Sequence, residues 1–140
     1  MGWLCIPQNR ALGYTLLMRD YFAEVPTYPP HHFHRRYRMR RSLFNKIVAM
    51  CEDNTRYFKR KRNAAGLMGF SVHQKISAVM HIFAYGIPAD YADEYLRIGE
   101  DKTLESVRRF CKVMMRVYGP IYLRDPNAED TARLMAENEQ

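Results

Sequence analysis

Apolar residues along this chain recur mainly at the three- and four-residue spacing that is typical of amphipathic helices. The clearest pattern covers residues 39–52, and its two neighbouring apolar rows consist of Met39, Leu43, Ile47, Met50, Phe44, Val48 and Cys51. A weaker helical pattern covers residues 11–23, where Gly13 lowers the helix propensity. No segment alternates convincingly between apolar and polar residues, as a half-buried strand would. The chain is therefore predicted to be all-α, a small bundle of about five to six helices.

Residues that start and stop helices define the middle of the chain. Ser71 followed by Gln74 matches a capping box, so a helix is expected to begin there. Gly86, with Pro88 two residues further on, is expected to end this helix in a left-handed glycine cap. A short helix is predicted over residues 88–97, with Gly99 closing it.

The second half of the chain predicts two more helices. The first covers residues 103–118 and is expected to stop at Gly119 and Pro120. The second covers residues 127–138, because Asn127 followed three residues later by Asp130 is a typical helix start.

Three regions follow from these elements. Residues 1–38 are predicted to be an N-terminal arm with a weak helix and a connector rich in Pro, His and Arg, which Pro26, Pro29 and Pro30 keep extended. Residues 39–126 are predicted to form a helical domain, and residues 127–140 a C-terminal helix. No apolar stretch is long enough for a membrane span, so no membrane partner is expected.

The segment 88–118 has the outline of a helix-turn-helix unit, a short helix followed by a turn and a longer helix. On a wheel with about 100° per residue, the apolar half of the long helix holds Leu104, Val107, Phe110, Cys111, Val113, Met114, Val117 and Tyr118. The other half holds the basic residues Arg108, Arg109, Lys112 and Arg116. A helix that binds DNA needs this partition, with one side seated on the core and the other facing phosphates and base edges.

A solvated face on an ordinary amphipathic helix is the alternative interpretation of these residues. Glu105 lies on the same face and favours that alternative. The turn is also long, since Ala92 and Gly99 are seven residues apart, whereas compact helix-turn-helix units use about four.

Positive charge is concentrated in the first part of the chain. The net charge is +7, with 14 basic and 4 acidic residues in 1–85 and 8 basic and 11 acidic residues in 86–140. One basic run contains Arg35, Arg36, Arg38, Arg40 and Arg41, which are candidates for holding a phosphate backbone. A second run, Lys59, Arg60, Lys61 and Arg62, is a candidate nuclear import signal. Both runs are also compatible with solvated charge at a loop or helix start.

Metal and cofactor chemistry find little support in the sequence. His31, His32 and His34 are clustered, but no Cys or carboxylate lies at a matching spacing, so neither a metal site nor a cofactor is expected. The cysteines Cys5, Cys51 and Cys111 are far apart and are expected to be buried thiols. No catalytic motif with a recognisable local context is present, and the acidic residues of 90–105 are expected to be solvated or helix-capping.

Several segments resemble the N-terminal, helical region of plant PIF/Harbinger-type transposases, over about residues 9–140. The matching stretches are 17–22 (LMRDYF), 36–44 (RYRMRRSLF), 84–90 (AYGIPAD), 96–100 (LRIGE), 105–111 (ESVRRFC), 122–124 (YLR) and 129–130 (ED). The resemblance implies a region that binds transposon-end DNA through a helix-turn-helix, resides in the nucleus and works beside a Myb-like partner protein.

The same resemblance implies that the catalytic carboxylates of a DDE nuclease follow the segment resembling 127–140. They lie beyond this chain, which is therefore expected to be a truncated or decayed transposon product, or a fragment, and not an enzyme on its own. Two functions stay open: a DNA-binding module, or a helical protein–protein interaction module that docks to a nuclease domain or to the Myb-like partner.

Overall fold

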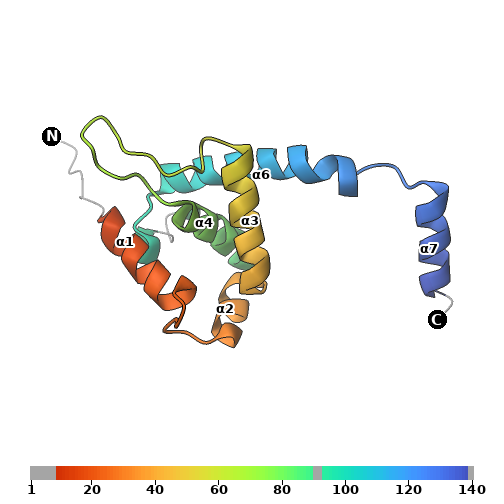
Figure 1. The fold of residues 1–140 in the computed structure, drawn as a ribbon, viewed down its shortest axis with the longest axis horizontal. Helices are drawn as coiled ribbons and strands as arrows, with labels where there is room; N and C mark the ends of the chain where they lie inside the picture. The colour runs from red at the N-terminus through yellow and green to blue at the C-terminus, as the bar shows by residue number, and fades with distance from the viewer. Residues whose placement is uncertain (1–8, 90–92, 139–140) are drawn as a thin grey trace.

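The computed structural model describes residues 9–89 and 93–138, and every named element in it is helical (Figure 1). The elements are α1 (Arg10–Leu17), a π-helical turn (Met18–Phe22), α2 (Pro30–Tyr37), α3 (Arg41–Asn54), α4 (Val72–Tyr85), α5 (Asp93–Leu96), α6 (Glu100–Tyr122) and α7 (Ala128–Asn138). Within these residues the only strand-like pairing is an isolated bridge between Arg62 and Met68. The all-α prediction is confirmed. No described helix combines the length and the apolar character that a membrane span requires.

The helix signals of α3 and α4 are confirmed in detail. The predicted helix 39–52 is α3, shifted by two residues at each end. At the start of α4 the Ser71 hydroxyl accepts a hydrogen bond from the Gln74 amide (3.1 Å), and the Gln74 side chain accepts one from the Ser71 amide (3.0 Å). Gly86 ends α4 with a left-handed φ of 61°. These ends follow from local chemistry, because each cap satisfies backbone groups that the helix leaves unpaired.

The prediction of an extended connector is wrong from Pro30 onward, because α2 begins there. Proline suits the first position of a helix, since its φ is already helical and its missing N–H would have no partner in any case. Phe33 and Tyr37, four residues apart on one face, are buried and hold α2 against the body. Arg38 closes the helix with a left-handed φ of 57°.

The core is built around an aromatic cluster that α2 and the π-helical turn share with α3. Phe33 and Tyr37 stack with ring centroids 4.3 Å apart, and Tyr37 meets Phe44 of α3 edge-on at 5.0 Å. The Tyr37 hydroxyl also shares a hydrogen bond of 2.9 Å with Ser77 of α4. The segment predicted as an arm is therefore, over residues 17–37, part of the same core as α3 and α4.

The long helix α6 starts earlier and ends later than the sequence predicts. It runs from Glu100 to Tyr122 and continues through Gly119 and Pro120, so the predicted stop at these two residues is wrong. Pro120 has no N–H to donate, so the carbonyl of Arg116 loses its partner within the helix. Arg116 and Pro120 are both exposed, so water can satisfy that carbonyl. The next turn is intact, with the Leu123 amide donating to the Gly119 carbonyl at 2.8 Å.

The C-terminal helix α7 stands away from the other helices, at the far end of a connector that follows α6 (Figure 1). Its predicted start is confirmed: the Asn127 side chain accepts from the Asp130 amide at 2.8 Å, and Asp130 accepts from the Asn127 amide at 3.1 Å. Arg124 adds a two-pronged contact to Asp130, at 2.6 and 3.0 Å. No residue of α7 is buried, so local capping rather than packing holds this helix.

Candidate nucleic-acid interface

The basic face predicted on the long helix exists in α6. Arg108, Arg109, Lys112 and Arg116 are all exposed. On the opposite side α6 buries Thr103, Ser106, Phe110 and Val113 against the other helices, and Val107, Met114 and Val117 are half-buried. The partition between an apolar seat and a basic face is therefore present.

Two residues assigned to the apolar half are exposed, Leu104 and Cys111. Both lie about 100° or more around the helix from Phe110, at the margin of the buried side. The prediction that all three cysteines are buried is wrong for Cys111 and right for Cys51, whose burial raises the pKa of its thiol to about 12. Cys5 lies outside the described residues.

The four basic residues of α6 are not equally available to a ligand. Arg116 donates a hydrogen bond to the main-chain carbonyl of Asn54, at the end of α3. Arg109 lies 4.0 Å from Glu105 and 5.5 Å from the centre of the Tyr57 ring. For Arg108 and Lys112 the part of the chain that the structure describes offers no ion pair or hydrogen bond, so these two are the freer cations.

Carboxylates crowd the beginning of α6. Glu100 and Asp101 lie in its first turn, where the positive end of the helix dipole favours them. A shallow hollow of about 520 Å³ on this face mixes signs, since it is lined by Asp101, Leu104, Glu105, Arg108, Arg109 and Lys112. In a helix-turn-helix the first residues of the recognition helix meet the bases, and carboxylates there oppose DNA. This face is better suited to phosphate contacts by Arg108 and Lys112 than to base recognition.

The predicted helix-turn-helix outline is only partly present. The first helix, predicted over 88–97, is the single turn α5, with residues 90–92 outside the described range. The left-handed residue of the turn is Arg97, with φ 57°, and not Gly99, which instead precedes α6 in an extended conformation. Leu96 and Ile98 are fully buried and fix the entry to α6.

The arginines of 35–41 gather where α2 meets α3, rather than along an extended arm. Arg35 and Arg36 lie in the last turn of α2, and Arg40 is the residue directly before α3, with no side-chain hydrogen bond to the helix start. Arg38 lies over the Tyr85 ring at 5.5 Å, and Arg41 donates to the Tyr21 carbonyl at 3.3 Å. Five arginines therefore lie at one junction, and two of them, Arg38 and Arg41, contact the fold.

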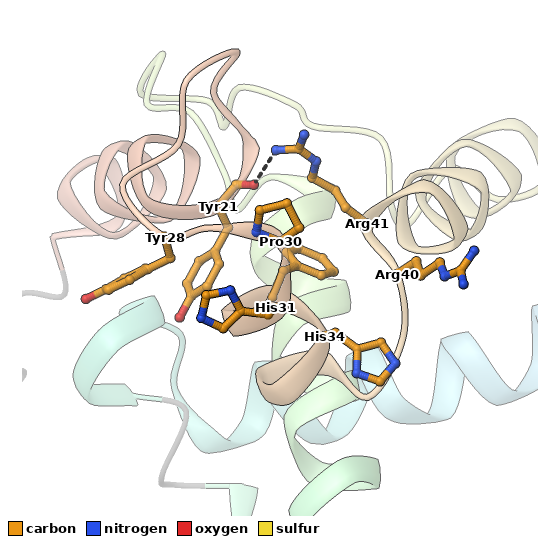
Figure 2. Close-up of a pocket in the computed structure, with 8 residues that line it drawn as sticks. Tyr21, Tyr28, Pro30, His31, His34, Arg40 and Arg41 are labelled. Atoms are coloured by element: carbon orange, nitrogen blue, oxygen red, sulfur yellow. Dashed lines mark hydrogen bonds between the residues drawn. The ribbon is translucent and has the colours of Figure 1, made fainter.

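A pocket of about 380 Å³ opens beside this junction (Figure 2). It is lined by Tyr21, Tyr28, Pro30, Phe33, His31, His34, Arg40 and Arg41, from the turn before α2, from α2 and from the start of α3. The sequence analysis missed the aromatic part of this site, because Tyr21 and Phe33 come together only through tertiary packing.

The second basic run, Lys59–Arg62, lies in the loop between α3 and α4. Arg60 donates to the Gly69 carbonyl at 3.0 Å and covers the Tyr14 ring at 4.3 Å. Arg62 donates to the Gly66 carbonyl at 2.8 Å. Two of its four cations therefore stabilise the loop, and Lys59 and Lys61 are exposed. The nuclear import signal stays a prediction.

The histidines His31, His32 and His34 are exposed on α2. Among the residues that the structure describes, no three His, Cys, Asp or Glu side chains are placed to hold a metal ion.

Comparison with known proteins gives one partial match. The family described as a domain of unknown function, DUF8418, matches residues 13–52, from within α1 through the π-helical turn and α2 to near the end of α3. No curated protein and no solved structure matches the chain. The matched segment contains both the aromatic cluster and the arginines of the α2–α3 junction.

Proposed function

We propose that this protein is a DNA-binding module whose main phosphate contact is the α2–α3 junction. The observation that carries the proposal is the gathering of Arg35, Arg36, Arg38, Arg40 and Arg41 over seven residues at this junction. Neither α2 nor α3 has an acidic residue in its first turn. Glu24 and Glu52 share a second hollow with Arg41, so Arg35, Arg36, Arg38 and Arg40 are the less opposed cations. Arg108 and Lys112 on α6 are a second, smaller contact.

The resemblance to plant PIF/Harbinger-type transposases gives this proposal its biological setting. On that basis the DNA is double-stranded and belongs to transposon ends, the protein resides in the nucleus, and a Myb-like protein is its partner. The module itself is proposed to lack nuclease activity and to need no cofactor. Its role is to hold DNA for a catalytic domain that resembles the family's nuclease.

A salt titration with charge variants tests DNA binding. The purified chain should bind a labelled duplex with an affinity that falls steeply as salt rises, because each phosphate contact releases counterions. Replacing Arg35, Arg36 and Arg40 together with Gln should weaken binding and lower the slope of log affinity against log salt by about 3. Replacing Arg108 and Lys112 should lower that slope by at most about 2.

Lys46 provides the control, since it is exposed on α3 but is not part of the junction. Lys46→Gln should leave affinity nearly unchanged. If the α6 variant loses more affinity than the junction variant, the DNA lies mainly on α6 and the main contact proposed here is wrong.

A helical interaction module is the second candidate, favoured by apolar side chains near the C-terminus. Six of them are exposed on α6, α7 and the residue after α6: Met115, Ile121, Tyr122, Leu123, Leu134 and Met135. A docking interface of this kind, for a nuclease domain or the Myb-like partner, would resist salt, whereas DNA binding by arginines would not. Absence of DNA binding at low salt would favour this second function.

A further inference from the structure

We propose that the pocket between α2 and α3 binds an unpaired nucleotide of DNA, with the base against its aromatic wall and the phosphate at Arg40 and Arg41. The inference rests on the proposed DNA binding and adds a preference for DNA that carries an unpaired base. It follows from three features of the pocket: its charge, its aromatic wall and its position among the other arginines.

The charge of the pocket is suited to an anion. Pro30 and His31 belong to the start of α2, and Arg40 and Arg41 to the start of α3, so the positive ends of two helix dipoles meet here. Neither helix start has a side-chain cap, and none of the eight residues that line the pocket is acidic. A phosphate entering the pocket would therefore meet two helix N-termini and Arg41, and Arg40 after it turns, with no acidic residue in the pocket lining.

The two arginines are held in different ways. Arg41 points toward the π-helical turn and donates to the Tyr21 carbonyl, which fixes its guanidinium at the pocket edge (Figure 2). Arg40 is exposed and points away from Tyr21 in the same view, free to turn toward a ligand. Arg41 is thus a preorganised contact, and Arg40 is the one that can be replaced without breaking a contact of the fold.

The wall of the pocket is suited to a planar ring. Tyr21 and Phe33 meet edge-on with centroids 6.0 Å apart, and Tyr28 lies 5.2 Å from Tyr21. Tyr21 and Phe33 are buried, whereas Tyr28 is 39% exposed and can still gain contacts. The volume, about 380 Å³, is within the range of small-molecule pockets, roughly 300–1,000 Å³. Aromatic side chains beside arginine are the combination on which proteins stack unpaired bases.

A base inside an intact duplex would first have to leave the stack and its pair, which costs free energy that an unpaired base does not pay. The ligand is therefore a nucleotide that is already unpaired, as at a strand end. A phosphotyrosine would fill the pocket with similar chemistry, but it needs only one phosphate site. Arg35 and Arg36 lie in the last turn of α2 and Arg38 closes that helix, within five residues of Arg40, and this density of positive charge favours a polymer with several phosphates.

The test compares a blunt duplex with the same duplex carrying a short unpaired thymidine tail, by fluorescence anisotropy at fixed salt. We expect the wild-type chain to bind the tailed DNA about tenfold more tightly, or by about 1.4 kcal/mol, since one base gains a stacking contact. Tyr28→Leu and Arg40→Gln should each reduce this ratio toward one. Lys46→Gln, which removes a charge outside the pocket, should leave the ratio unchanged.

Equal binding of both DNAs by the wild type would overturn the inference, while binding of the blunt duplex would still support DNA binding as such. Loss of the ratio in Lys46→Gln as well as in Arg40→Gln would also overturn it, because the effect would then be general charge. Failure to bind either DNA would overturn the proposed function itself. Displacement of the tail by a phosphotyrosine peptide, but not by thymidine monophosphate, would reassign the pocket to a phosphopeptide.

Discussion

The guanidinium of Arg116 on α6 donates a hydrogen bond to the main-chain carbonyl of Asn54, the last residue of α3. A helix leaves its last carbonyls unpaired, and the negative end of its dipole favours a cation there. Arg116 therefore caps α3 from another helix. A residue that the sequence places on the DNA-facing side of α6 also holds two helices together.

Arg116→Ala is expected to lower the free energy of unfolding by about 0.5–1.5 kcal/mol, through loss of this hydrogen bond and of the dipole interaction. Arg108→Ala, on the same exposed face, should change stability by less than about 0.5 kcal/mol. Urea unfolding of both variants checks this. Equal stability of the two variants would mean that the Asn54 contact contributes nothing, and Arg116 would then be a clean probe of DNA binding.

The Tyr57 hydroxyl is expected to anchor the loop between α3 and α4 onto α6. It shares a hydrogen bond of 2.9 Å with the buried Ser106, and Lys75 lies 4.3 Å from the ring centre on α4. Tyr57→Phe should cost about 1 kcal/mol, because Ser106 loses a buried partner. In a double-mutant cycle with Ser106→Ala, the two losses should not add. Additive losses would show that the hydroxyls do not interact in solution.

Gly13 is expected to be indispensable although it lies inside a helix. A Cβ at this position would come within 2.5 Å of the Leu96 carbonyl oxygen and 3.0 Å of the Arg97 side chain. Gly13→Ala should therefore lower the melting temperature, against the gain of about 1 kcal/mol that alanine normally gives in a helix.

Gly119 in α6 is the matched control, since nothing lies within 4 Å of a Cβ built there. Pro120 follows, and its ring disfavours the helical conformation of a preceding residue that has a Cβ, which offsets the gain in helix propensity. Gly119→Ala should therefore change the melting temperature far less than Gly13→Ala. A stabilised Gly13→Ala variant would contradict the close packing of α1 against the end of α5.

Acid is expected to destabilise the fold through His81. Its ring lies 5.2 Å from Tyr37, and its Nε2 atom is buried without a hydrogen-bond partner among the described residues. Burial, assisted by the charge of Arg36, lowers the pKa of His81 from 6.5 to about 4. Below pH 6.5 the unfolded chain gains a proton that the folded chain does not take up until about pH 4, so stability falls as the pH is lowered across this window.

The loss between pH 6.5 and 4 should be on the order of 3 kcal/mol, which His81→Leu should largely remove. Unfolding in urea at a series of pH values measures it. Burial also lowers the pKa of His73, so a shallower dependence in the same direction should remain in the variant. An unchanged slope in His81→Leu would assign the acid sensitivity to other groups.

Local chemistry in the sequence was sufficient to determine three helix ends. The Ser71–Gln74 capping box, the glycine cap at Gly86 and the start at Asn127 each involve residues within four positions of one another. The apolar rows of α3 and α6 likewise predict which faces are buried, because helical geometry repeats without knowledge of the partner. Fold class and the basic face of α6 were therefore predictable.

Tertiary structure decided the rest, because the contacts involved join residues far apart in the chain. A helix begins at Pro30 because Phe33 and Tyr37, on one face of that helix, pack against Phe44 of α3. Gln74 donates to the carbonyls of Arg10 and Leu96, at 3.1 Å each, which no local pattern indicates. Three other features depend in the same way on which helices pack together. They are the contact of Arg116 with Asn54, the aromatic pocket, and the approach of Gly13 to Leu96. The sequence by itself determined the fold class and the helices other than α2, because their patterns and caps are local. The packing of the helices decided which arginines stabilise the fold and which face solvent.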